Sequence, residues 1–508
     1  MQKNILKAFR IGDQGSYTSS GFIFKARADA NEILIDHTWK YDNSIHDINQ
    51  YAQILMLRFC DSYLSNLPTS SDILPLEKVL EIIIHIDINN QNSELAWDPM
   101  MASTRVLKYL YLQEYILKDL NFGDGTTFLD IKNKISSRIM FHVEKFKSIK
   151  IPNNNHGLQG LHALVALSKY NYSHQSIDSA IYNLAKVFKN KFNGEGFYEE
   201  NSSEYHFYGV QLIDSFNSLG WYNNTELNEL HDLAISNYND LFATKGEVFS
   251  FGDTDRHLIK RQVQKNVIPY IEEEPNRMEI KNITGYALSK LNENVENSSL
   301  MLVNHFHCNT HNHHDYMSFE WFCANSWIII DPGKYSYDDT SISKWFYSDT
   351  AHNTIQLSRL GHNPQQSKKN INGYDFLNHR VLVAKIADKN FNASRTIMHM
   401  PYRVCIIDDI ENNLDITQST ASCLLIGYDF KEIKVISEFE LEFTSEHLRL
   451  TVFSNTPLMS YYGSHEPFRG WYSPKYRNLE PCWQIESEFY IHSKDTKSVT
   501  FNISVDCL

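Results

Sequence analysis

The spacing of apolar residues changes part way along this 508-residue chain, and this change constrains the fold more than any other feature. In the first half, apolar residues recur every three or four positions, as at Ile181, Leu184 and Phe188, which is the spacing of an amphipathic helix. From about residue 285 they alternate with polar residues, as at Phe501 and Ile503, which is typical of antiparallel strands with one buried face. The sequence therefore predicts an α+β multidomain chain, with packed helices followed by an antiparallel β-sandwich.

The helical part contains several segments that are long enough for helices joined by short polar links. They are 47–66, 76–90, 99–119, 128–147, 157–170, 176–191 and 225–243. Helices with one apolar stripe each must stack on one another as a bundle, a solenoid or a closed toroid, and the absence of a fixed-period repeat argues against a named solenoid repeat. The charged stretch 257–284 is the predicted linker, so we expect a helical domain over 1–275 and a β-sandwich domain over 276–508.

The charge balance narrows the partners that the chain can have. Lys and Arg total 47 against 61 Asp and Glu, which gives a formal net charge of −14 and argues against nucleic acid or an anionic membrane as a partner. No run of apolar residues is long enough for a transmembrane helix. The first twenty residues lack the apolar core of a secretion signal, so we expect a chain that works inside the cell unless a leader has been removed.

A dense cluster of imidazoles is the strongest chemical signal in the sequence. It consists of His305, His307, His311, His313, His314 and Asp315. If this segment is a strand, His311 and His313 point to the same face, because side chains alternate along a strand. The cluster predicts a role in acid–base chemistry or in metal binding.

Two later motifs could complete a metal site. Asp331 follows an apolar strand and precedes Pro-Gly, and His352 lies in an Ala-His-Asn-Thr segment. Two histidines and one aspartate from separate strands suit zinc, with a fourth position for water or a protein group.

Further polar motifs occur in the helical part. Asn155–His156–Gly157 precedes a helix and is typical of an N-terminal cap, while Tyr205 and His206 lie in a second polar segment. The carboxylates of the loop 250–256 could bind a cation or brace an arginine. Trp97 and Arg105 could line a sugar-binding groove by stacking and by carboxylate pairing.

Together these motifs resemble those of the heparinase II/III-like polysaccharide lyases. They occur in the same order over about residues 90 to 400: Asn155–His156–Gly157, Ser202-x-x-Tyr205–His206, Gly252–Asp253–Thr254–Asp255, His311-x-His313-x-Asp315-x-x-Ser318–Phe319, Asp331-x-Gly333 and Ala351–His352–Asn353–Thr354. The resemblance implies an N-terminal (α/α) toroid of helical hairpins before a C-terminal antiparallel β-sandwich. It also implies cleavage of an acidic, uronic-acid-containing polysaccharide by β-elimination, which leaves a 4,5-unsaturated uronate end.

The resemblance also implies a catalytic role for four residues. Asn155 neutralises the uronate carboxylate, and His156 assists it or acts as the base. Tyr205 is the acid, and it is also the base where the proton and the leaving group lie on one face of the sugar. His311 is the other candidate base.

A zinc ion and a substrate groove follow from the same resemblance. One structural zinc per chain is expected on His313, Asp331 and His352, and a register slip of one residue would replace His313 by His314. Three further residues are expected to bind substrate: Trp97, Arg105 and His206.

Other enzyme classes remain open at this stage. The His311-x-His313-x-Asp315 segment also matches the first ligands of metallo-β-lactamase-like hydrolases, but Tyr316 stands where those enzymes have histidine, and the helical part has no place in that fold. A uronate C5-epimerase would need the same proton abstraction, and a glycan-binding protein would need only the fold. Cationic residues are sparse in the motifs, which favours an unsulfated or lightly sulfated glycan of the capsular, heparosan, hyaluronan or alginate type. The oligomeric state is not predicted.

Overall fold

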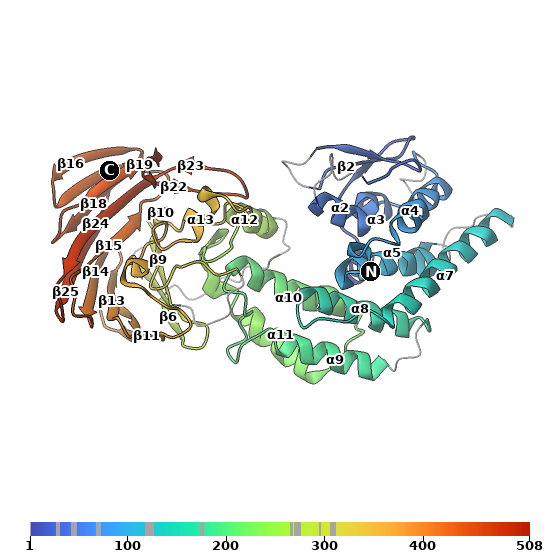
Figure 1. Ribbon diagram of the computed structural model, residues 1–508, viewed down its shortest axis with the longest axis horizontal. Helices are drawn as coiled ribbons and strands as arrows, with labels where there is room; N and C mark the ends of the chain where they lie inside the picture. The colour runs from blue at the N-terminus through green and yellow to red at the C-terminus, as the bar shows by residue number, and fades with distance from the viewer. Residues whose placement is uncertain are drawn as a thin grey trace. The chain divides into compact units, whose positions relative to one another are not determined.

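The computed structural model describes residues 2–26, 31–41, 48–67, 73–116, 126–172, 177–264, 268, 276–293, 296–304 and 311–508. These residues form two compact units, which we describe separately. The first unit comprises Met1–Lys191 and Gln211–Leu230, and the second comprises Phe192–Val210 and His231–Leu508. Helices dominate the blue and green part of the chain and strands dominate the orange and red part (Figure 1). None of the described helices is long and apolar enough to cross a membrane.

Each of the seven predicted helical segments contains a helix. The helices are α1 (Gln2–Ala8), α2 (Ile48–Leu55), α3 (Asp61–Ser65), α4 (Leu76–Asn90), α5 (Pro99–Tyr111), α7 (Thr126–Phe146), α8 (Asn155–Lys169), α9 (Ile177–Lys189), α10 (Ser203–Asn217) and α11 (Thr225–Ser236). A short π-helical segment, Leu112–Ile116, continues α5. The α10 helix was not predicted, because its first turn has the polar composition of a loop. The toroid implied by the resemblance stays a prediction.

A small sheet interrupts the helices near the N-terminus, where we predicted no strands. Its strands β1 (Ser16–Tyr17), β2 (Phe22–Phe24) and β3 (Ile33–Ile35) pair in sequence order. The Phe22 ring contacts Phe59 at 5.1 Å and Tyr63 at 6.0 Å between centroids, so the sheet adds to the helical core. Strands of two or three residues are too short to show a period in the sequence.

The second unit contains the predicted β-sandwich. A five-stranded antiparallel sheet has the order β10-β9-β8-β7-β6, and an eight-stranded antiparallel sheet has the order β11-β12-β13-β14-β25-β18-β17-β16. Buried residues of both sheets, such as Leu300 and Ile397, share one hydrophobic core, which confirms the sandwich. A third sheet, β15-β24-β19, contributes Ile485 to the same core.

The bounds of these strands are as follows. The five-stranded sheet contains β6 (Arg277–Lys281), β7 (Tyr286–Glu293), β8 (Glu296–Val303), β9 (Phe319–Cys323) and β10 (Ser326–Ile329). The eight-stranded sheet contains β11 (Lys368–Asp375), β12 (Arg380–Ala387), β13 (Phe391–Met400), β14 (Arg403–Asn412), β16 (Glu432–Ser437), β17 (Glu440–Thr444), β18 (Leu448–Ser454) and β25 (Thr496–Cys507). The third sheet contains β15 (Gln418–Leu425), β19 (Met459–Tyr462) and β24 (Trp483–Ile491).

The segment between the two kinds of structure is not only a linker. The predicted linker 257–284 contains most of α12 (Arg256–Gln264) and all of β6. Helix α12 ends at Gln264 and strand β6 begins at Arg277, and the predicted boundary at residue 275 stays a prediction. The compact units divide the chain differently, because residues 192–210 and 231–264 are grouped with the sheets.

One buried ion pair ties the eight-stranded sheet to the loops that carry the candidate site. Arg395 of β13 and Asp408 of β14 are directly opposite in register, and two guanidinium nitrogens bind the two carboxylate oxygens at 2.7 Å each. Arg395 also donates to the backbone carbonyls of Met317 and Asn353. Both side chains of the pair are fully buried, so each charge depends on the other.

This ion pair predicts a large loss of stability when one partner is removed. Arg395→Met should lower the free energy of unfolding of the second unit by about 3–5 kcal/mol, because Asp408 is left buried and uncompensated. The matched control is Arg449→Met on β18, whose pair with Glu442 spans 3.8 Å and is partly exposed, so it should cost at most about 1 kcal/mol. Denaturant unfolding of both variants measures the difference, and equal losses would contradict the account.

Candidate active site

Tyr205 is positioned by the start of α10. Ser202 precedes the helix, and its hydroxyl accepts the Tyr205 backbone N–H at 3.4 Å and donates to the Asp253 carbonyl at 2.8 Å. This hydroxyl therefore joins the first turn of α10 to the loop that contains Asp253. The phenol oxygen of Tyr205 lies 3.2 Å from the phenol oxygen of Tyr337.

Gly252 brings three chain segments together. Its φ is +56°, and a Cβ at this position would lie 2.0 Å from the Asn201 carbonyl oxygen and 2.6 Å from that of His311. Only glycine allows this approach and this conformation. The next residue, Asp253, donates its backbone N–H to the His311 carbonyl at 3.1 Å, so residues 201, 252 and 311 meet at one point.

The carboxylate of Asp253 holds both histidines of the predicted cluster. Its Oδ2 lies 2.7 Å from His311 Nδ1, and its Oδ1 lies 3.0 Å from His313 Nε2. Burial alone would raise the pKa of Asp253, but the hydrogen bonds from His311 and His313 outweigh it and hold that pKa well below its usual range. A charged Asp253 accepts the Nδ1 proton of His311, which leaves His311 Nε2 as the nitrogen with a free lone pair.

The His311 imidazole stacks on the Tyr205 ring. Their centroids are 3.7 Å apart and their planes differ by 18°, while His311 Nε2 lies 3.5 Å from a carboxylate oxygen of Glu200. Burial raises the pKa of Tyr205 well above its usual value, although the hydrogen bond with Tyr337 opposes the change. The phenol is thus a proton donor at neutral pH, next to an imidazole that can accept a proton.

Three residues of this site carried no signal that we recognised in the sequence: Lys334, Tyr337 and Glu204. The Lys334 ammonium is buried, lies 3.2 Å from a Glu204 oxygen and faces the rings of Tyr205 and Tyr337 at 5.9 and 5.7 Å. Both Lys334 and Tyr337 follow closely after the Asp331-Pro-Gly turn. Their place near the site could have been inferred from that turn, but their contacts with α10 could not.

Asn155 and His156 lie at the start of α8, in the first compact unit. The Asn154 side chain caps the helix by accepting the Gly157 N–H at 3.1 Å, and a Cβ on Gly157 would lie 1.7 Å from the Pro152 carbonyl oxygen. The Asn155 Oδ1 accepts the His156 N–H at 2.9 Å, whereas its Nδ2 has no hydrogen-bond partner among the described residues. That amide can therefore donate to a ligand.

His156 forms a partly exposed pair with Asp98. Its Nδ1 lies 2.9 Å from both carboxylate oxygens, and the hydrogen bond that it donates to Asp98 raises the pKa of His156. Asp98 also caps α5 by accepting the Met100 N–H at 2.9 Å. The pair thus fixes the ring of His156 to a second helix of the same unit.

The predicted substrate-binding role is wrong for two residues, Arg105 and His206. Arg105 is 1% exposed, and its guanidinium donates to the carbonyls of Leu55 and Ala96 at 3.0 and 2.6 Å. It therefore joins helices of the first unit and cannot meet a glycan.

His206 is fully buried as well, with both ring nitrogens occupied. Its Nδ1 accepts the Tyr198 N–H at 3.2 Å, and its Nε2 lies 3.0 Å from the Ala234 carbonyl. The ring stacks on Phe197 with a centroid distance of 4.3 Å. Burial lowers the pKa of His206 to about 3, so it is a neutral packing residue.

The third predicted substrate-binding residue, Trp97, is half-buried. Its indole N–H donates to the Gln91 carbonyl at 2.7 Å, and the Lys145 ammonium lies 5.3 Å from its ring centroid. Its role as a sugar platform stays a prediction.

The predicted metal ligands lie close to one another in the second unit. The His352 Nε2 faces the Phe346 carbonyl at 3.1 Å, and its Nδ1 lies 2.7 Å from Asp331 Oδ2. The His313 ring centroid is 5.3 Å from that of His352, and His313 Nδ1 is buried without a partner in the described part of the chain. His313 is buried and His314 is exposed, which favours His313 of the two.

These ligands do not form a complete cluster. Among the described residues, no group of three or more His, Cys, Asp or Glu side chains is arranged to hold a metal ion. The zinc site therefore stays a prediction. His305 and His307 lie outside the described residues.

One reading of the sequence was that the carboxylates of the loop 250–256 brace an arginine, but they do not brace Arg256. Asp253 holds the histidines, and Asp255 Oδ1 accepts the Leu258 N–H of α12 at 2.8 Å. Arg256 is paired with Glu320 of β9 and lies over the Trp327 ring.

The Asp98–His156 pair predicts a pH window for its contribution to stability. Because its folded pKa is raised, His156 stabilises the fold below about pH 6.5 and loses this effect as the pH rises through the folded pKa. Burial raises the pKa of Asp98, but the hydrogen bond and charge of His156 and the backbone N–H groups of Met100 and Met101 together lower it. Asp98 therefore contributes above about pH 4 and loses its effect in more acid solution. The contribution of the pair should be largest between these limits.

Thermal unfolding of Asp98→Asn between pH 4 and pH 9 tests this window. We expect the loss in Tm relative to the parent chain to be largest near about pH 5–6 and to shrink above about pH 8. The control is Asp130→Asn, whose exposed partner Lys134 does not titrate in this range. A loss that is constant with pH, as in the control, would show that the pair does not form.

Comparison with known proteins gives a family match for part of the chain and a fold for the whole of it. Residues 290–375 match the family model described as heparinase II/III-like, C-terminal, a range that includes His311, His313, Asp331 and His352. A search of curated proteins found no match.

Solved structures show the fold. A heparinase III structure has a TM-score of 0.72 at 13% identity, with coverage of 99% of this chain and 85% of the other. The heparan sulfate lyase HepC from Pedobacter heparinus has a TM-score of 0.70 at 12% identity, with coverage of 100% and 83%. A heparinase III with methylated lysines gives 0.71 at 12%, with coverage of 100% and 84%. The resemblance seen in the motifs is therefore confirmed: residues 290–375 match the heparinase II/III-like C-terminal domain, and the chain has the fold of heparinase III.

Proposed function

We propose that this chain is a polysaccharide lyase that cleaves a uronic-acid-containing glycan of the glycosaminoglycan type by β-elimination. The observation that carries the proposal is the stack of Tyr205 on His311, with His311 held by the buried carboxylate of Asp253. A proton donor and a proton acceptor thus lie side by side. A solved structure of the same fold is named a heparan sulfate lyase, which supports the class of reaction.

β-Elimination makes three chemical demands on the protein. The proton on C5 of a uronic acid is weakly acidic, so the neighbouring carboxylate must be neutralised to stabilise the charge that develops on it. A base must remove that proton, and an acid must protonate the departing O4. The electron pair of the C5–H bond forms the C4–C5 double bond as the C4–O4 bond breaks.

His311 and Tyr205 meet the second and third demands. His311 Nε2 takes the C5 proton, and the imidazolium that forms is stabilised by the carboxylates of Asp253 and Glu200, at 2.7 and 3.5 Å from its two nitrogens. The Tyr205 phenol gives its proton to O4. The raised pKa of Tyr205 suits this acid role better than the alternative in which Tyr205 is also the base. Proton transfer from the imidazolium to the phenolate restores both groups.

For the first demand we propose Asn155, the residue that the family resemblance implies. The Nδ2 amide of Asn155 is a hydrogen-bond donor that is not used within the described residues, and it lies at the positive end of the α8 dipole. Donation to the uronate carboxylate would favour the intermediate. His156, kept cationic over a wider pH range by Asp98, would act in the same sense.

Two cations on the segments that carry the candidate site support an unsulfated or lightly sulfated substrate. Lys334 is paired with Glu204, and Arg256 is paired with Glu320. A dense row of sulfates would need cations that lack such partners. We therefore place heparosan-like chains and hyaluronan ahead of heavily sulfated glycans, with alginate and capsular uronans also to be tested.

Ultraviolet absorbance tests this function, because elimination creates a conjugated C4–C5 double bond. We expect a rise with at least one uronic-acid polysaccharide, and a fall in kcat of about a hundredfold or more for Tyr205→Phe. The matched control is Tyr208→Phe, one turn further along α10, which should keep most of the activity. Both variants lose one hydroxyl, so a difference between them isolates the acid role of Tyr205.

Other outcomes identify the competing functions. New reducing ends without absorbance would indicate a hydrolase and would contradict the proposal. Exchange of the C5 proton with solvent deuterium without cleavage would indicate an epimerase. Binding without either reaction would leave a glycan-binding protein of the same fold.

We also propose a structural zinc ion on His313, Asp331 and His352. His352 Nε2–H donates to the Phe346 carbonyl, so the Nδ1 lone pair of the neutral ring faces the Asp331 carboxylate. Nδ1 and Asp331 Oδ2 are then two acceptors only 2.7 Å apart, and they need a proton or a cation between them. Asp253 accepts a hydrogen bond from His313 Nε2, which is the contact that carboxylates make with metal-bound histidines. The Nδ1 lone pair of His313 is therefore unused within the described residues. The ion would brace the fold, and the proposed reaction does not require it.

Metal analysis of the purified chain tests this site. We expect one zinc per chain, its loss in His313→Ala, and its retention in His314→Ala, because His314 is exposed. A parent chain without zinc, but with His352 protonated and paired to Asp331, would contradict the zinc proposal.

A further inference from the structure

We propose that the outer face of the eight-stranded sheet binds an acidic glycan chain at a second site, apart from Tyr205 and His311. This face contains a groove of about 460 Å³ across β11, β12, β13 and β14, and we call it the sheet-face groove. Its volume is within the range of pockets that hold small organic ligands. The binding itself is independent of the catalytic steps, whereas the choice of a uronate glycan as its ligand rests on the proposed function.

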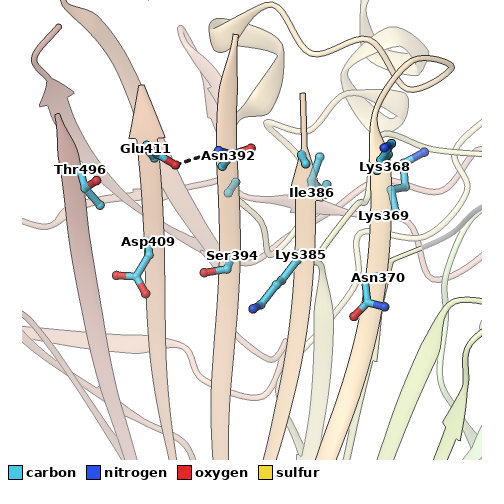
Figure 2. A pocket seen from close by; sticks show the side chains of 12 residues that line it. Lys368, Lys369, Asn370, Lys385, Ile386, Asn392, Ser394, Asp409, Glu411 and Thr496 are labelled. Carbon is cyan, nitrogen blue, oxygen red and sulfur yellow. Dashed lines mark hydrogen bonds between the residues drawn. The ribbon is translucent and has the colours of Figure 1, made fainter. Parts of the chain in front are cut away.

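Strand register places polar side chains in two rows across the groove. In one row Asn370 pairs with Lys385, Lys385 with Ser394, and Ser394 with Asp409. In the second row, two residues further along each strand, the aligned residues are Lys368, Ala387, Asn392, Glu411 and Thr496. Figure 2 shows the side chains of each row at one level across neighbouring strands. Neighbouring strands are about 4.8 Å apart, so the first row spans roughly 14 Å and the second roughly 19 Å.

The centre of the groove is hollow because short side chains occupy it. Ala387 and Ser394 lie between the longer side chains of β11 and β14. The alternate residues of β12, Ala384 and Ile386, point to the opposite face and belong to the core of the sandwich. The hollow is therefore formed by strand residues and does not depend on a loop.

The charges of the groove suit an acidic chain rich in hydroxyl groups. Lys368 and Lys385 are exposed, and within the described part of the chain neither ammonium has a hydrogen bond or ion pair. The nearest carboxylate in the same row, Asp409, is two strands from Lys385, or about 10 Å, which is too far for an ion pair. In a chain with a net charge of −14, these two cations form a local site for uronate carboxylates.

The rest of the groove can accept hydrogen bonds from sugar hydroxyls. The Asn392 amide donates to Glu411 at 2.8 Å, which orients both side chains, and Asp409 and Ser394 supply further oxygens. A row of such groups at regular spacing fits a repeating polymer laid across the strands. A second copy of the chain is a poorer fit, because a hollow face does not match its own hollow.

A second site for the polymer has a measurable kinetic consequence. A long chain held on the sheet-face groove stays near the enzyme after each cleavage, which raises its effective concentration at the active site. A short oligosaccharide cannot reach both sites. Loss of the groove should therefore raise KM for the polymer and leave kcat and the KM for a tetrasaccharide unchanged.

Affinity electrophoresis in gels that contain heparosan, with hyaluronan as a second probe, tests the binding directly. The Tyr205→Phe chain is used, so that the glycan is not consumed. Lys368→Ala combined with Lys385→Ala should weaken binding of the retarding glycan roughly tenfold or more, as expected for two charge-assisted contacts. Ser394→Trp, which fills the hollow, should have the same effect without a change of charge. The control is Lys434→Ala, an exposed lysine of β16 at the far edge of the same sheet.

The outcomes distinguish the second site from the proposed function. If retardation depends on Lys385 but the parent chain has no lyase activity on any of the glycans, the groove is supported and the proposed lyase function is refuted. If the parent chain is a lyase and none of the groove variants changes the KM for the polymer, the groove proposal alone is refuted. An equal loss in Lys434→Ala would show diffuse electrostatic attraction and would overturn the proposal. The proposal would also be overturned if sedimentation velocity shows a dimer and Ser394→Trp disrupts that dimer without any effect on glycan binding.

Discussion

The hydrogen bonds of the Asp253 carboxylate are the interactions on which the candidate site depends. One buried carboxylate fixes the rings of His311 and His313, and its own place is set by the turn at Gly252, where no larger residue fits. Because the anion accepts the Nδ1 proton of His311, the opposite nitrogen keeps the lone pair that the proposed base needs. The same carboxylate orients His313 toward the predicted zinc ligands. The proposed chemistry and the proposed metal site are thus coupled through one side chain.

The β-sandwich acts as a rigid support with two different faces. Its inner faces form the core, and the buried Arg395–Asp408 pair connects that core to the loops at Met317 and Asn353, which flank the candidate site. The outer face of the same strands carries the two polar rows of the sheet-face groove. Alternation of side chains along each strand allows one set of strands to support both features.

The sequence predicted the fold class well, because periodicity reports which face of an element is buried. It also grouped His311 with His313 correctly, although a loop and not a strand carries them. It failed for Arg105 and His206, because a polar residue on a helix gives no sign of the distant carbonyls that occupy it. Lys334 and Tyr337 were missed for a related reason, since their roles arise only where a turn after β10 meets α10.

The rate of elimination by an Asp253→Asn chain shows whether the proposed chemistry depends on the Asp253 carboxylate. This change keeps the shape of the side chain and removes its charge, so His311 loses the partner that fixes its tautomer and stabilises its protonated form. We expect a fall in kcat of about a thousandfold or more, with the fold and the KM little changed. An Asp253→Asn chain that keeps kcat within a few-fold of the parent would contradict the role of Asp253 and, with it, His311 as the base.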